Sequence, residues 1–79
     1  MDDKTVSYTD PTVLWQLHHP ADGRTARATI IPGSPTSTLV FFVDDQFERG
    51  ENFDEWDVAI AHANAVRDEL LTEGWQEAN

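Results

Sequence analysis

The sequence predicts an α+β domain in which a three-stranded antiparallel meander is covered on one face by one C-terminal helix. Two observations lead to this fold class. Residues 52–75 carry apolar side chains at steps of three and four, the period of an amphipathic helix. Residues 12–45 form three alternating or apolar segments, and turn-forming residues separate them.

The predicted helix spans residues 52–75. Its expected apolar face consists of Trp56, Ala59, Ile60, Ala63, Val66 and Leu70. Asn52 and Glu55 have the spacing of a capping box at the start, and Gly74 can adopt the left-handed conformation that ends a helix, so that Trp75 folds back. The alanine-rich middle keeps one side of the helix slim, and we therefore expect a sheet to approach it closely.

Three strands are expected before the helix. Residues 12–19 alternate between the two faces, and the pair Asp22-Gly23 after them is a strong hairpin signal. Residues 25–31 form the second strand, which a Pro- and Gly-containing turn ends. Residues 38–45 are apolar on both faces, which favours the central or the best-covered position in the sheet.

The 79 residues are sufficient for one domain, which we place at residues 12–75. Residues 1–11 are expected to be a flexible N-terminal tail, residues 46–51 an extended or looped connection, and residues 76–79 a C-terminal tail. No apolar run approaches the roughly 20 residues of a membrane helix, and the N-terminus lacks the features of a signal peptide. Without cysteine there is no disulfide framework or thiolate site. We therefore expect a cytoplasmic protein that does not enter a membrane.

Acidic residues dominate the charge, with fifteen Asp and Glu against five Lys and Arg and a net charge of −10. Binding to a nucleic-acid backbone requires cations that displace counterions, so this composition disfavours nucleic acid as a partner. Two interpretations of the acidity remain open. It is either a solvated surface of the kind found in salt-adapted proteins or a charged surface that binds a basic target.

Few side chains have the types that metal sites or catalysis need. His18 and His19 are strand neighbours and point to opposite faces, and His62 lies off the apolar stripe of the helix. The acidic segment 44–54 does not match the spacing of a calcium loop, which favours a solvated connection. No serine has the context of an activated nucleophile. We expect no catalytic, cofactor-binding or metal-binding residue, no identifiable small-molecule substrate and a protein that is not an enzyme.

One helix covers one face of a sheet, yet apolar residues are predicted on the second face as well. The candidate interaction face comprises Leu14, Arg27, Ile31, Val40 and Phe42. Either tails and loops cover this face, or it contacts a second copy of the chain or another protein. The leading hypothesis is a non-catalytic interaction domain. The alternative is an acidic inhibitor or antitoxin-like protein that binds a basic target surface.

A W-x-L strand, a D-G-R turn, an aromatic third strand and a helix ending in E-L-L-T-E-G-W give the sequence a family resemblance. The residues that carry it are Trp15, Leu17, Asp22, Gly23, Phe41, Phe42, Trp56, Ala59, Leu70, Gly74 and Trp75. This pattern resembles a set of short uncharacterised prokaryotic proteins over most of residues 12–75, and it implies the fold and no function. The outline is also similar to the arm-binding domains of tyrosine integrases and, at residues 50–56, to Hic-type antitoxins. Both likenesses concern topology alone.

Overall fold

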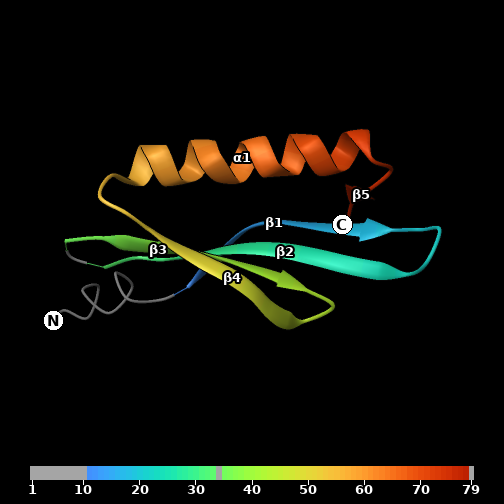
Figure 1. Cartoon of the computed structure of the whole chain (residues 1–79), viewed down its shortest axis with the longest axis horizontal. Coiled ribbons are helices and arrows are strands. Elements are labelled where there is room, and N and C mark those ends of the chain that lie inside the picture. Colours follow the sequence, from blue (N-terminus) through green and yellow to red (C-terminus); the bar gives the residue numbers. More distant parts are fainter. Residues whose placement is uncertain (1–10, 34, 79) are drawn as a thin grey trace, which may run out of the picture.

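The computed structural model describes residues 11–33 and 35–78 and shows one helix above a curved antiparallel sheet (Figure 1). The elements are β1 (Thr12–His19), β2 (Arg24–Ile31), β3 (Ser37–Val43), β4 (Gln46–Phe53), α1 (Trp56–Thr72) and β5 (Gln76–Glu77). The strand order is β4-β3-β2-β1-β5. The predicted α+β class with one C-terminal helix is confirmed, but the prediction of three strands was wrong, because the sheet has five. The tail expected before Thr12 lies, except for Pro11, outside the described residues.

The fourth strand follows a two-residue turn at Asp44 and Asp45. Both residues have positive φ, at 53° and 65°, and Val43 pairs with Gln46 on either side of them. Positive φ at both central residues is the geometry of the tight turn whose twist matches a hairpin. The Asp44 carboxylate accepts hydrogen bonds from the Thr25 N–H at 3.0 Å and from Arg24 Nε at 3.2 Å. The Thr25 amide contributes most to lowering the pKa of Asp44.

Replacing Asp45 by glycine and, separately, by alanine is expected to separate the backbone cost of this turn from its ion pair. Both variants lose the contact between Arg27 and the Asp45 carboxylate, which at an exposed site contributes at most about 1 kcal/mol. Only alanine keeps a Cβ in the left-handed region. We expect Asp45→Gly to be more stable than Asp45→Ala by about 1 kcal/mol, measured by urea unfolding. Equal stabilities would contradict the strained turn.

The helix begins later than the sequence pattern indicated. Glu55 is the N-cap residue and makes no side-chain capping hydrogen bond. Asn52 lies in β4, where its side-chain oxygen accepts a hydrogen bond from the Thr38 hydroxyl at 2.8 Å. The predicted capping box was therefore wrong, and Trp56, assigned to the apolar face, is 44% exposed.

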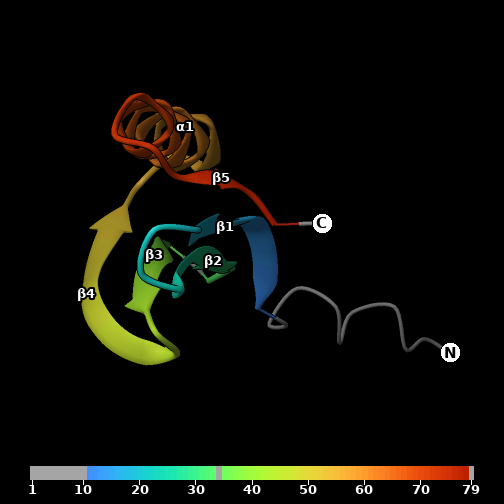
Figure 2. The same ribbon diagram turned by 90° about the vertical axis from the view of Figure 1, so that its right-hand side faces the viewer.

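The end of the helix agrees with the sequence pattern. Gly74 has a φ of 100°, and the N–H of Trp75 donates to the Leu70 carbonyl at 3.2 Å. The indole of Trp75 then packs on the ring of His19, with 5.1 Å between ring centroids. This reversal directs the chain back toward the sheet, where β5 pairs with β1 (Figure 2).

The core lies between α1 and the sheet. Its buried cluster comprises Trp15, Leu17, Ala26, Ala28, Leu39, Phe41 and Ala63. Ala59 and Ala63, on α1, are completely buried, and Trp15 Nε1 donates a hydrogen bond to the Ala63 carbonyl at 2.9 Å. The small helix residues therefore allow the close approach that the alanine-rich segment predicts. Among the described residues, no helix is long and apolar enough to cross a membrane.

Candidate functional site

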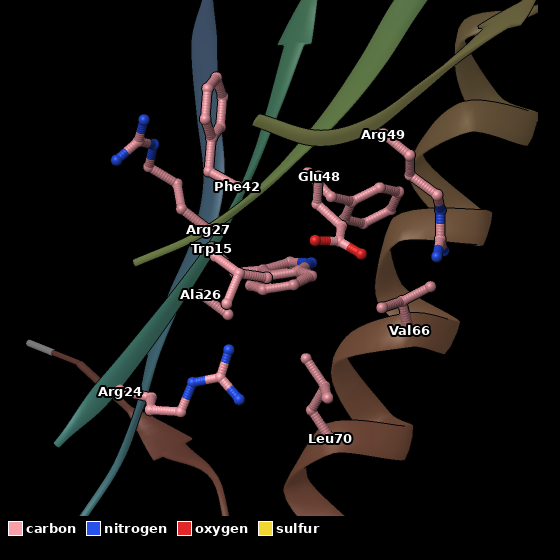
Figure 3. Close-up of a pocket in the computed structure, with 11 residues that line it drawn as sticks. Trp15, Arg24, Ala26, Arg27, Phe42, Glu48, Arg49, Val66 and Leu70 are labelled. Carbon is pink, nitrogen blue, oxygen red and sulfur yellow. The ribbon is translucent and has the colours of Figure 1, made fainter. Parts of the chain in front are cut away.

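The central part of the predicted interaction face lies on the side of the sheet opposite α1. Arg27 pairs with Phe42, and Thr29 pairs with Val40. The Arg27 guanidinium lies 4.3 Å from the centroid of the Phe42 ring, and its Nη1 donates to the Asp45 carboxylate at 3.0 Å. Figure 3 shows both side chains directed away from the helix. Arg27 thus covers part of the apolar surface of Phe42.

The remaining members of that face are not equally available. Val40 is only 7% exposed, whereas Ile31 is 37% exposed at the end of β2. Leu14 lies at an irregularity in the register of β1, between Val13 and Trp15, and packs against the core cluster. The structure therefore brings Arg27, Val40 and Phe42 together, places Ile31 at the end of the sheet, and turns Leu14 toward the core.

The most exposed aromatic side chain among the described residues is Phe47, at 66%. It pairs with Phe42 across β4 and β3, so it belongs to the face opposite α1. A Cβ built on Gly50 would lie 3.6 Å from the Phe47 ring, which shows that the ring rests beside this glycine. The sequence interpretation missed Phe47 because residues 46–51 read as a polar connection. Its signal was one aromatic residue two positions after the turn at Asp44 and Asp45.

β4 forms one edge of the sheet. Arg49 pairs with Phe41 and Glu51 pairs with Leu39, so both charged side chains lie on the side of α1. Arg49 Nε lies 3.5 Å from the Glu51 carboxylate. Among residues 11–33 and 35–78, no strand pairs with the outer edge of β4, and that edge therefore presents unpaired backbone groups.

A groove of about 260 Å³ opens between the sheet and the second half of α1 (Figure 3). Its apolar lining includes Trp15, Phe41, Val66 and Leu70. The charged residues that line the groove are Arg24 and Arg27 from β2 and Glu48 and Arg49 from β4, and the guanidinium of Arg27 points away from the helix (Figure 3). Figure 3 shows the guanidinium of Arg24 on the side of Leu70 and that of Arg49 on the side of Val66. The groove combines an aromatic floor with cations at two ends.

The histidines make separate contacts. His19 Nδ1 donates to the Asp22 carboxylate at 2.9 Å, and this hydrogen bond is the main cause of the lowered pKa of Asp22. The ring of His62 lies near the rings of Phe41 and Phe53, at centroid distances of 6.2 and 5.6 Å. Among the described residues, no group of three or more His, Cys, Asp or Glu side chains could hold a metal ion.

Comparisons of the chain with protein-family models, with curated proteins and with solved structures give no match. The resemblance to short prokaryotic proteins therefore stays a hypothesis. The fold and its surfaces define a small α+β domain in which the outer edge of β4 is unpaired among the described residues and an apolar groove lies beside α1, and the function is inferred from these two features.

Proposed function

We propose that this protein is a non-catalytic interaction domain that pairs with a second copy of itself along the outer edge of β4. The observation that carries the proposal is Phe47, which is 66% exposed and lies beside Gly50 on an edge strand. Strand addition satisfies the backbone groups of an exposed edge, and neighbouring side chains then determine which partner fits. An exposed aromatic ring next to that edge is the kind of side chain that anchors an interface.

Charge selects the register of the self-pairing. In a symmetric antiparallel pair of β4 strands that continues the sheet, directly opposed residues must have their side chains on the same face. The two-fold axis therefore passes between the two copies of one residue. An axis at Gly50 places Arg49 of each copy opposite Glu51 of the other copy, so two such pairs form. An axis through Arg49 or through Glu51 instead places two like charges directly opposite each other, which is destabilising. Of these three positions of the axis, only the one at Gly50 places opposite charges against each other.

The same register brings apolar surface together on the opposite face. Two Gly50 residues then face each other without side chains, and one Phe47 ring from each copy lies beside them. The regular part of β4 is short, because its register with β3 shifts between Phe41 and Phe42. Small interfaces belong to the weak, transient class, so we expect a dissociation constant in the range of about 10–100 μM.

Two oppositely charged variants test the register. In Arg49→Glu the opposed charges become Glu against Glu, and in Glu51→Arg they become Arg against Arg, so each variant alone should be monomeric. Mixed together, the variants restore opposite charges at both positions and should form a heterodimer. Sedimentation velocity between about 10 μM and 1 mM, with one variant carrying a dye, measures both results.

Phe47→Gln tests the apolar contribution and should shift the wild-type dimer toward monomer without lowering the unfolding midpoint. Ile31→Gln is the matched control, because Ile31 is exposed on the same face but far from the β4 edge, and it should leave the dimer intact. A monomeric wild-type protein at 1 mM, or a mixture of the charge variants that stays monomeric, would refute the self-pairing.

A further inference from the structure

We propose that the groove between α1 and the sheet binds a small amphiphilic carboxylate, whose anionic group contacts Arg24 and whose apolar part lies on Trp15. The ligand class is a short alkyl or aryl carboxylic acid. The groove lies on the helix side of the sheet and Phe47 lies on the opposite side, so the groove is separate from the apolar part of the proposed dimer contact, and Arg49 takes part in both.

The lining of the groove accounts for the apolar part of the ligand. Trp15 and Phe41 come from the sheet, with 6.1 Å between their ring centroids, and Val66 and Leu70 come from α1. Binding pockets are typically apolar with a few polar groups that orient the ligand. Their usual volumes begin at about 300 Å³, so a groove of about 260 Å³ fits a ligand of roughly ten non-hydrogen atoms.

The distribution of arginine accounts for the anionic group. The chain has only five Lys and Arg residues against fifteen Asp and Glu, yet the side chains of Arg24 and Arg49 both lie at this groove (Figure 3). In an acidic protein, a carboxylate is repelled from most of the surface and is attracted where cations gather. The groove is thus a local exception to the overall charge.

Arg24 has the geometry to bind a carboxylate. Its Nε donates to the Asp44 carboxylate, and no described residue accepts a hydrogen bond from its two terminal nitrogens. Figure 3 shows these nitrogens on the groove side, facing Trp15 and Leu70. A guanidinium binds a carboxylate through two parallel hydrogen bonds. Arg24 and Asp44 are each half exposed, so water screens their pair and Asp44 does not neutralise Arg24 completely.

Glu48 opposes the binding of an anionic ligand in the groove. Figure 3 shows its carboxylate over the groove, between Trp15 and Arg49, and its charge repels an anionic ligand. Arg49 lies at that end, with its guanidinium 4.7 Å from the Phe41 ring centroid. The ligand carboxylate is therefore placed at Arg24 and its apolar end toward Glu48. Replacing Glu48 by glutamine removes the repulsion and should raise the affinity.

Octanoate is the probe, and octan-1-ol is its uncharged counterpart of similar length. The three tryptophans give three indole N–H signals in a ¹⁵N–¹H correlation spectrum. The signal of Trp15 should shift in a saturable manner, with a dissociation constant of about 1 mM for a ligand of this size. Octan-1-ol should bind at least fivefold more weakly.

Arg24→Gln should weaken octanoate binding at least fivefold and leave octan-1-ol binding unchanged. Arg67→Gln is the matched control, since it removes the same charge from a residue of α1 that does not line the groove, and it should change the affinity less than twofold. Glu48→Gln should strengthen octanoate binding about twofold or more. Each variant is first checked for an unchanged spectrum elsewhere.

The proposal is overturned if octanoate gives no saturable shift, if octan-1-ol binds equally well, or if Arg24→Gln and Arg67→Gln weaken binding equally. Phe47→Gln separates this site from the dimer contact. It should remove self-association and retain octanoate binding, so either proposal can fail without the other.

Discussion

Trp15→Ala is expected to lower the free energy of unfolding by about 3–5 kcal/mol, the usual cost of removing a buried Trp or Phe side chain. Trp15 is the largest member of the core cluster, and it connects the sheet to α1 through its contact with Phe41 and its hydrogen bond to the Ala63 carbonyl. Small domains have a total stability of about 0.05–0.15 kcal/mol per residue. For 79 residues this range is about 4–12 kcal/mol, so the loss removes a large part of the total stability and the urea midpoint should fall strongly.

The measurement is urea unfolding followed by far-ultraviolet circular dichroism, because the variant lacks one of the fluorescent residues. Trp15→Phe is the graded control. It keeps most of the ring and loses the hydrogen bond to Ala63, so it should cost about 1–2 kcal/mol. Val13→Ala, at an exposed position of the same strand, should change the free energy of unfolding by less than about 1 kcal/mol. A folded Trp15→Ala protein with an unchanged midpoint would contradict the assigned core.

The elements that could be predicted from the sequence are those whose pattern is local. The helix shows its period over many residues, Asp22-Gly23 marks a hairpin, and β3 is apolar on both faces, where Leu39 and Phe41 on one side and Val40 on the other are all buried. β4 has one neighbouring strand and mostly exposed side chains, so its sequence shows little alternation between apolar and polar residues. Its turn uses two aspartates in the left-handed region, where glycine or asparagine would have been the recognisable signal.

The candidate sites depend on contacts between distant residues and were only partly predictable. Alternation along β2 and β3 placed Arg27 and Phe42 on one face, and the structure confirms that they share it. The stacking of the Arg27 guanidinium on the Phe42 ring depends on the register between β2 and β3, which the sequence does not show. The groove requires β1, β2, β3, β4 and α1 at once. The two cations assigned to its ends, Arg24 and Arg49, are 25 positions apart in the sequence, so no local motif marks them.

The two proposed sites share Arg49. Its backbone and charge take part in the β4 edge, and its guanidinium lies at the groove and on the Phe41 ring. Pairing of two copies would draw the Arg49 side chain toward Glu51 of the second copy and away from the groove. We therefore place the ligand carboxylate at Arg24, which lies in β2, two strands away from the β4 edge.

Ala63→Leu is the second substitution with a large expected effect, a loss of about 1–3 kcal/mol in the free energy of unfolding. Ala63 is completely buried against the sheet, so the added carbons have no space unless α1 moves outward. That movement would lengthen the hydrogen bond from Trp15 Nε1 to the Ala63 carbonyl, which is 2.9 Å long. The Trp15 indole proton should then exchange with solvent faster than in the wild-type protein.

Ala65→Leu is the matched control, because Ala65 lies on the exposed side of the same helix and because alanine and leucine have similar helix propensities. This variant should stay within about 0.5 kcal/mol of the wild type and keep the wild-type exchange rate of the indole proton. The two substitutions add the same atoms to one helix, so any difference between them measures how closely α1 approaches the sheet. If Ala63→Leu were as stable as Ala65→Leu, the helix would have room above the sheet, and the alanine pair would not be what fixes the distance between the two layers.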